Sequence, residues 1–121
     1  MAGARMRRVN EAVREVVSVH LAEGLKDPRI GFVTVTGVET SPDLRYARVY
    51  VSILGDEPSR ADALEGLRSS RGFLQAQLGS ELRMKRTPTL EFINDDTVRR
   101  ADRLTRLIDE AAAAAGQERR A

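Results

Sequence analysis

The chain has 121 residues, a formal net charge of +2, no cysteine and a single histidine, His20. This length fits one domain that folds without metals or disulfides. The lack of cysteine excludes disulfide scaffolds, thiol nucleophiles and cysteine metal sites, and one histidine makes a transition-metal site improbable. The basic start has no apolar signal-peptide core, and no stretch is apolar enough to span a bilayer. We therefore expect a cytoplasmic protein without cofactors or membrane contact.

The first predicted element is an amphipathic helix over residues 5–23. Its apolar residues recur at three- and four-residue spacing. His20 falls beside this stripe, and we expect it to be partly buried with one ring nitrogen hydrogen-bonded. Gly24 ends the helix, because Asp27 and Pro28 prevent its continuation. The stripe consists of Val9, Ala12, Val13, Val16, Val17 and Leu21.

Two strands follow, framed by two turns. Residues 32–40 are rich in β-branched side chains, and Gly37 marks a predicted bulge because the apolar positions change parity near it. Residues 46–53 alternate between apolar and polar side chains. The short connection through Ser41, Pro42 and Asp43 predicts an antiparallel hairpin.

Helical patterns occupy the next part of the chain and are interrupted at Gly72. Ser59 and Asp62 have the spacing of a capping box for the first of these helices, which turns Leu64 and Leu67 inward. Glycine inside a helix costs about 1 kcal/mol relative to alanine, so Gly72 predicts a kink or a packing contact. The helical pattern resumes after Gly72 with Phe73, Leu74, Ala76, Leu78 and Leu82.

A short strand over residues 90–93 and a helix capped by Asp95 or Asp96 complete the pattern. We expect one domain at residues 1–111, including this C-terminal helix, and a disordered tail at residues 112–121. The last helix has a predicted inward stripe of Val98, Ala101, Leu104, Leu107, Ile108 and Ala111.

The predicted order is helix, strand, strand, helix, kink, helix and strand, with an additional C-terminal helix. Three strands with one apolar face, and helices gathered on that face, predict an α+β fold of two layers. Fold class alone does not identify a function.

Several segments, spread over roughly residues 5–107, resemble bacterial ribosome-binding factor A in the same order. In the first half they are Lys26-Asp27-Pro28-Arg29-Ile30-Gly31, Val33-Thr34-Val35 and Ser41-Pro42-Asp43-Leu44, followed by Ala47, Val49, Tyr50 and Val51. In the second half they are Gly72-Phe73-Leu74, Leu82-Arg83-Met84 and Pro88-Thr89-Leu90-Glu91-Phe92, followed by Asp95 or Asp96.

This resemblance implies a type II KH-like domain in which the Gly-x-x-Gly loop is replaced by an Ala-x-Gly kink. Here the kink is Ser70-Arg71-Gly72, with serine in place of alanine. The resemblance also implies binding to the small (30S) ribosomal subunit and its 16S rRNA precursor, a role in late maturation, rRNA processing and cold adaptation, and no catalytic activity. We expect a monomer and leave open its displacement by a GTPase. The alternative is a protein-interaction module that binds no RNA.

Basic residues supply the predicted RNA contacts, because neutralising phosphates releases counterions and provides affinity without sequence preference. The competing interpretation is that these arginines solvate exposed helix faces or, on the first helix, pair with Glu11 and Glu15. The predicted RNA-binding residues are Arg7, Arg8, Arg14, Arg68, Arg71, Gly72, Arg83, Lys85 and Arg86.

Other exposed side chains have two open interpretations. Tyr46 and Tyr50 either stack on RNA bases or pack across strands. Arg99, Arg103 and Arg106 on the last helix either reach the ribosome or keep the helix solvated. The two proline-containing turns are predicted to be structural, with the functional contacts around Gly72 and on the first helix.

Overall fold

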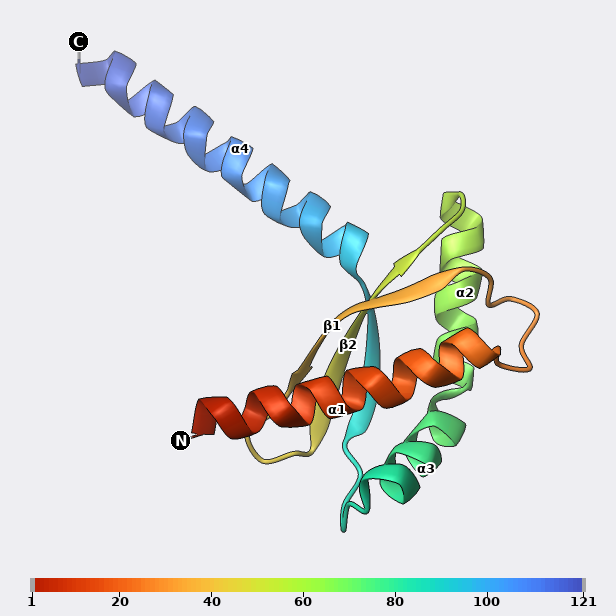
Figure 1. Cartoon of the computed structure of the whole chain (residues 1–121). Coiled ribbons are helices and arrows are strands. Elements are labelled where there is room, and N and C mark those ends of the chain that lie inside the picture. Colours follow the sequence, from red (N-terminus) through yellow and green to blue (C-terminus); the bar gives the residue numbers. More distant parts are fainter. Residues whose placement is uncertain (1, 121) are drawn as a thin grey trace.

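The computed structural model describes residues 2–120, with side-chain burial defined from Gly3 to Gly116. This part of the chain forms a three-stranded sheet and four helices, which confirms the predicted α+β order (Figure 1). The elements are α1 (Ala2–Glu23), β1 (Val33–Thr40), β2 (Tyr46–Ile53), α2 (Glu57–Ser69), α3 (Arg71–Leu82), β3 (Thr89–Asn94) and α4 (Asp95–Arg120).

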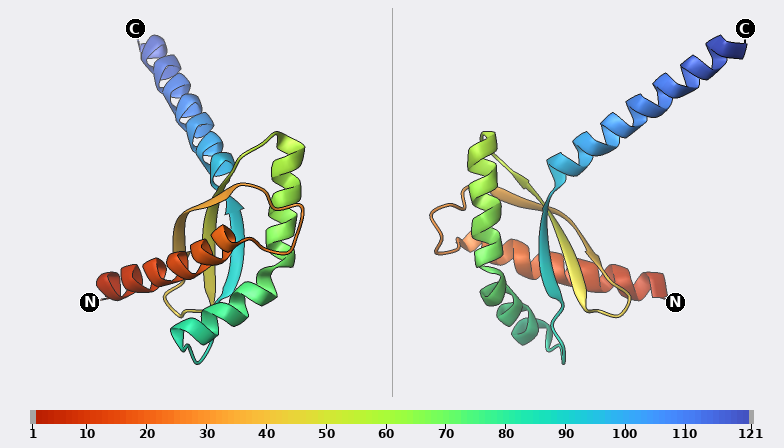
Figure 2. Two further views of the ribbon diagram at one scale, coloured as in Figure 1. Left: turned by 45° about the vertical axis from the view of Figure 1, so that its right-hand side comes forward. Right: turned by 180° about the vertical axis from the view of Figure 1, so that it is seen from behind.

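The sheet has the strand order β1-β2-β3. β1 and β2 form the expected antiparallel hairpin, and β3 lies parallel to β2. The register between β1 and β2 shifts between Val35 and Gly37, which confirms the predicted bulge. The helices α1, α2 and α3 cover one face of the sheet, and within residues 2–120 no helix covers the other face (Figure 2).

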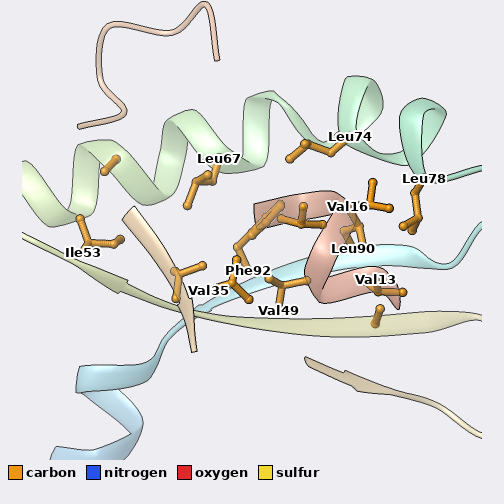
Figure 3. Close-up of a cluster of buried hydrophobic side chains, with 14 residues drawn as sticks. Val13, Val16, Val35, Val49, Ile53, Leu67, Leu74, Leu78, Leu90 and Phe92 are labelled. Atoms are coloured by element: carbon orange, nitrogen blue, oxygen red, sulfur yellow. The ribbon is translucent and has the colours of Figure 1, made fainter. Parts of the chain in front are cut away.

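The hydrophobic core lies between this covered face and the three helices (Figure 3). β2 contributes every second side chain, as its alternation predicted, and β3 contributes Leu90 and Phe92. Leu67 of α2 and Leu74 of α3 are fully buried. Burying each such side chain stabilises the fold by roughly 1.5–3 kcal/mol. The core residues of β2 are Ala47, Val49, Val51 and Ile53.

Helix boundaries follow local backbone chemistry. Gly24 has a φ of +88°, a left-handed conformation that favours glycine and ends α1 as expected. The predicted Ser59–Asp62 capping box is wrong: the Asp56 carboxylate accepts a hydrogen bond of 2.9 Å from the Ser59 amide, so α2 begins earlier. Pro58 in the first turn favours that start, because proline has no amide hydrogen to satisfy.

The last helix differs most from the prediction. The side-chain oxygen of Asn94 accepts a hydrogen bond of 3.0 Å from the Asp96 amide and caps α4. The sequence pattern predicts this role for Asp95 or Asp96. α4 then extends away from the sheet, and all residues from 101 to 116 are exposed (Figures 1 and 2). Leu104 is 59% exposed, so the prediction of an inward stripe is wrong. A 3.6-residue period identifies an apolar helix face but not what covers it.

The helix α4 continues to Arg120, whereas the composition predicts a disordered tail from residue 112. Ala121 lies outside the described residues. The division into a domain at residues 1–111 and a tail at residues 112–121 remains a prediction.

Candidate nucleic-acid interface

A single residue, Ser70, separates α2 from α3. Its amide donates to the carbonyl oxygens of Gly66 and Leu67 at 3.0 and 3.1 Å and so completes α2. Its own carbonyl accepts the Leu74 amide at 3.0 Å and so begins α3. The backbone at Ser70 (φ −87°, ψ 0°) produces the change in direction. The kink predicted at Ser70-Arg71-Gly72 is therefore present, with its bend one residue before Arg71.

The turn after α1 is docked beside this kink. The Arg29 guanidinium donates to the Asp27 carboxylate at 2.6 Å and to the Ser69 hydroxyl at 3.1 Å. Hydrogen bonds from the Arg29 side chain and amide lower the pKa of the Asp27 carboxyl from its usual 3.8 to about 2. A Cβ at Gly66 would lie 2.8 Å from Cγ1 of Ile30, so only glycine lets the turn approach α2 this closely.

A hollow of about 480 Å³ lies between the turn and the kink. Phe73, one of the apolar residues of the helical pattern after Gly72, borders it and is 51% exposed. The reason is geometric: α3 buries Leu74 and Leu78, which lie one turn apart, and Phe73 is about 100° around the helix from Leu74. The residues lining the hollow are Gly24, Leu25, Lys26, Asp27, Ser69, Ser70 and Phe73.

Three of the predicted RNA-binding residues are at the kink. Arg68 and Gly72 are exposed, and Arg71 is half-buried. The Nε of Arg71 is buried and has no hydrogen-bond partner within residues 2–120. Among the described residues, no neighbouring atom lies within 4 Å of a Cβ placed at Gly72, so a ligand backbone can approach there. The first turn of α3 contains no acidic residue that would repel a phosphate.

Lys26 also lines the hollow, although it is not among the predicted contacts. A sequence signal for it exists, since Lys26 begins the segment of residues 26–31 that resembles the family. The proline in that segment favours a purely structural interpretation. The segment of residues 26–31 packs against the end of α2, about 40 residues later in the sequence, and this packing places Lys26 beside the kink.

Arg83, Lys85 and Arg86 lie at the other end of α3. They are exposed, and Arg83 ends α3 with a left-handed φ of 51°. Because α3 has 12 residues, this group lies about 18 Å from the kink, so the predicted basic residues form two groups. The Thr89 amide donates to the Arg45 carbonyl at 2.8 Å, which places a further arginine near the second group. No pattern in the sequence points to Arg45.

Arg7, Arg8 and Arg14 lie on the exposed face of α1. They line a shallow hollow together with Glu11 and Glu15. Arg14 lies 3.8 Å from the Glu11 carboxylate, an exposed pair that contributes about 0–1 kcal/mol. Both interpretations of this face, RNA contact and internal pairing, therefore remain compatible with the geometry.

The uncovered sheet face carries Tyr46, Arg48 and Tyr50. Arg48 lies between Glu39 and Glu91 in the strand register, and the Tyr50 hydroxyl donates to Glu39 at 3.3 Å. Two carboxylates beside one arginine disfavour phosphate binding. The contact to Glu39 favours cross-strand packing for Tyr50, and stacking on RNA remains an untested prediction.

The side chain of His20, a residue of α1, contacts α3. Its Nε2 is 2.8 Å from the Glu81 carboxylate and its side chain is 15% exposed, as predicted. In the described part of the chain, no three or more histidine, aspartate or glutamate side chains gather as metal ligands would. None of the helices within residues 2–120 has the length and apolar character needed to cross a membrane.

Comparison with known proteins identifies the family of this chain. The family model described as ribosome-binding factor A matches residues 5–108. The chain belongs to the ribosome-binding factor A family. A ribosome-binding factor A from Anaeromyxobacter sp. (strain K) is 54% identical over 108 residues, which cover 88% of this chain and 78% of that protein.

Solved structures of the family share the fold. A solution NMR structure of a putative ribosome binding factor A from Thermotoga maritima has a TM-score of 0.69 and 34% identity, covering 75% of this chain and 87% of that one. A Thermus thermophilus ribosome binding factor A homology model, fitted into a cryo-EM map of a 30S complex, has a TM-score of 0.55 and 31% identity. The match covers 74% of this chain and 89% of the homology model.

Proposed function

We propose that this protein binds the small ribosomal subunit through its 16S rRNA, using the basic surface around the kink. The observation that carries the proposal is the set of cations at the α2–α3 kink: Arg68 and Arg71 flank Ser70 in the chain, beside the exposed Gly72, and Lys26 lines the hollow next to Ser70. Neutralising phosphates with such residues gives affinity without base specificity. The Thermus thermophilus relative fitted into a 30S complex supports the choice of partner.

In this proposal the protein acts by binding and performs no catalysis. It binds an immature arrangement of the 16S rRNA more tightly than the finished one and so shifts the equilibrium between RNA conformations. Late maturation and rRNA processing then proceed from the favoured conformation. The effect matters most in the cold, where wrongly paired RNA rearranges slowly. The protein works as a cytoplasmic monomer and leaves when the finished arrangement forms; removal by a GTPase is one route for that step.

Sucrose-gradient fractionation of cells enriched in small-subunit precursors tests this proposal. At low salt we expect the protein in the fractions of free small subunits. Charge reversal by Arg71→Glu and Arg83→Glu should move it toward the top of the gradient, while Arg48→Glu on the uncovered sheet face should not. Absence of the unaltered protein from small subunits would overturn the proposal. Unchanged sedimentation of both charge-reversal variants would favour the protein-interaction alternative.

A further inference from the structure

Phe73 is an aromatic ring on the surface of α3 that the core does not use. It is 51% exposed, whereas its neighbour Leu74 is fully buried. It borders the hollow of about 480 Å³ between the kink and the turn after α1. An exposed aromatic ring beside a concave surface marks a place where a flat ligand can be bound.

The Phe73 ring is held in a defined orientation. It meets the His20 ring edge to face, with centroids 5.7 Å apart and an angle of 87° between the planes. His20 is fixed by the Glu81 carboxylate at 2.8 Å. A ring positioned in this way loses little conformational entropy when a ligand stacks on it.

The charges around the hollow favour a ligand with an anionic backbone. Lys26 lines the hollow, and Arg68 and Arg71 flank the kink that forms one of its walls. The one carboxylate among the lining residues, Asp27, is already paired with Arg29 at 2.6 Å. A flat aromatic group attached to phosphates is a nucleotide, and an unpaired base offers a free face for stacking.

We propose that an unpaired RNA base stacks on Phe73 within this hollow, with its flanking phosphates near Lys26 and Arg71. This inference rests on the proposed RNA binding and specifies the kind of RNA that is bound: the kink face recognises single-stranded RNA. A continuous double helix does not fit this description, because its bases are stacked on one another.

Tryptophan fluorescence tests the stacking directly, because the chain has no tryptophan. The variant Phe73→Trp introduces a single indole at the edge of the hollow. Leu54→Trp is the matched control: Leu54 is 78% exposed and precedes α2, whose 13 residues separate it from the kink by about 20 Å. The probes are a single-stranded RNA oligonucleotide and an oligonucleotide of the same length with abasic sugars. Fluorescence anisotropy of labelled RNA measures binding independently.

We expect the base-containing RNA to quench the fluorescence of the Phe73→Trp variant, and the abasic RNA and the Leu54→Trp variant to show no quenching. Phe73→Ala should weaken binding of the base-containing RNA by about tenfold, and Phe73→Tyr should retain it. RNA binding without quenching in Phe73→Trp would overturn the stacking and leave the proposed function intact. Loss of small-subunit binding in Phe73→Ala with unchanged RNA affinity would assign Phe73 to a protein partner and also overturn it. Failure of the unaltered protein to bind any of these RNAs or the small subunit would overturn both.

Discussion

The guanidinium of Arg29 donates a hydrogen bond of 3.1 Å to the hydroxyl of Ser69 and so joins the turn after α1 to the end of α2. The two residues are 40 positions apart in sequence. Their contact places Lys26 at the hollow beside the kink. The turn is therefore structural, as its sequence predicted, and it also forms one side of the candidate interface.

The ion pair between Asp27 and Arg29 should make stability depend on pH. The hydrogen bonds from Arg29 lower the pKa of Asp27 to about 2 in the folded state, below its usual 3.8. Ionised Asp27 therefore contributes stability above about pH 4, and this contribution is lost as the pH falls toward 2. Urea unfolding of Asp27→Asn should show a deficit relative to the unaltered protein at pH 6 that shrinks toward pH 2.

The matched control for this prediction is Asp109→Asn, which changes an exposed aspartate on α4. Its urea midpoint should follow that of the unaltered protein at each pH. An Asp27→Asn deficit that is equal at every pH would show that the ion pair does not stabilise the turn.

Two glycines at opposite ends of the kink region should respond differently to alanine. At Gly66 a Cβ would lie 2.8 Å from Cγ1 of Ile30, so we expect Gly66→Ala to lower the free energy of unfolding by about 1–2 kcal/mol through overpacking. At Gly72 the described part of the chain places no neighbouring atom within 4 Å of the added carbon, so Gly72→Ala should leave stability unchanged or raise it slightly. Denaturant titration of both variants measures the difference, and equal losses would contradict the close docking of the turn.

Leucines of α2 and α4 should differ in their contribution to stability. Leu67 is fully buried, so Leu67→Ala should cost about 2–5 kcal/mol. Leu104 is 59% exposed on α4, so Leu104→Ala should change the free energy of unfolding by less than about 0.5 kcal/mol. A large loss in Leu104→Ala, measured by thermal unfolding, would mean that α4 packs against the domain in solution.

Much of the fold could be predicted from local patterns. The strict alternation of residues 46–53 identified a strand with one buried face, and the change of parity identified the bulge at Gly37. Periodicity alone does not show which apolar residues are buried. Phe73 and Leu104 both fit helical periodicity, but whether a helix face is covered depends on where the helix lies relative to the sheet.

The candidate site was predictable only in part. The kink followed from Gly72 and from the resemblance to the family. The separation of Arg83 from the kink follows from the length of α3, whereas the approach of Lys26 to the kink depends on tertiary packing. No spacing in the sequence reports a contact such as that between Arg29 and Ser69.

Binding of RNA phosphates by the kink face is tested most directly by the salt dependence of binding to 16S rRNA. The logarithm of the binding constant is measured against the logarithm of salt concentration for the unaltered protein, Arg71→Gln and the control Arg48→Gln. Arg71→Gln should weaken binding and reduce the magnitude of the slope by about 0.7 for each phosphate that it no longer neutralises, while Arg48→Gln changes neither. An affinity and slope for Arg71→Gln that equal those of the unaltered protein would contradict the account.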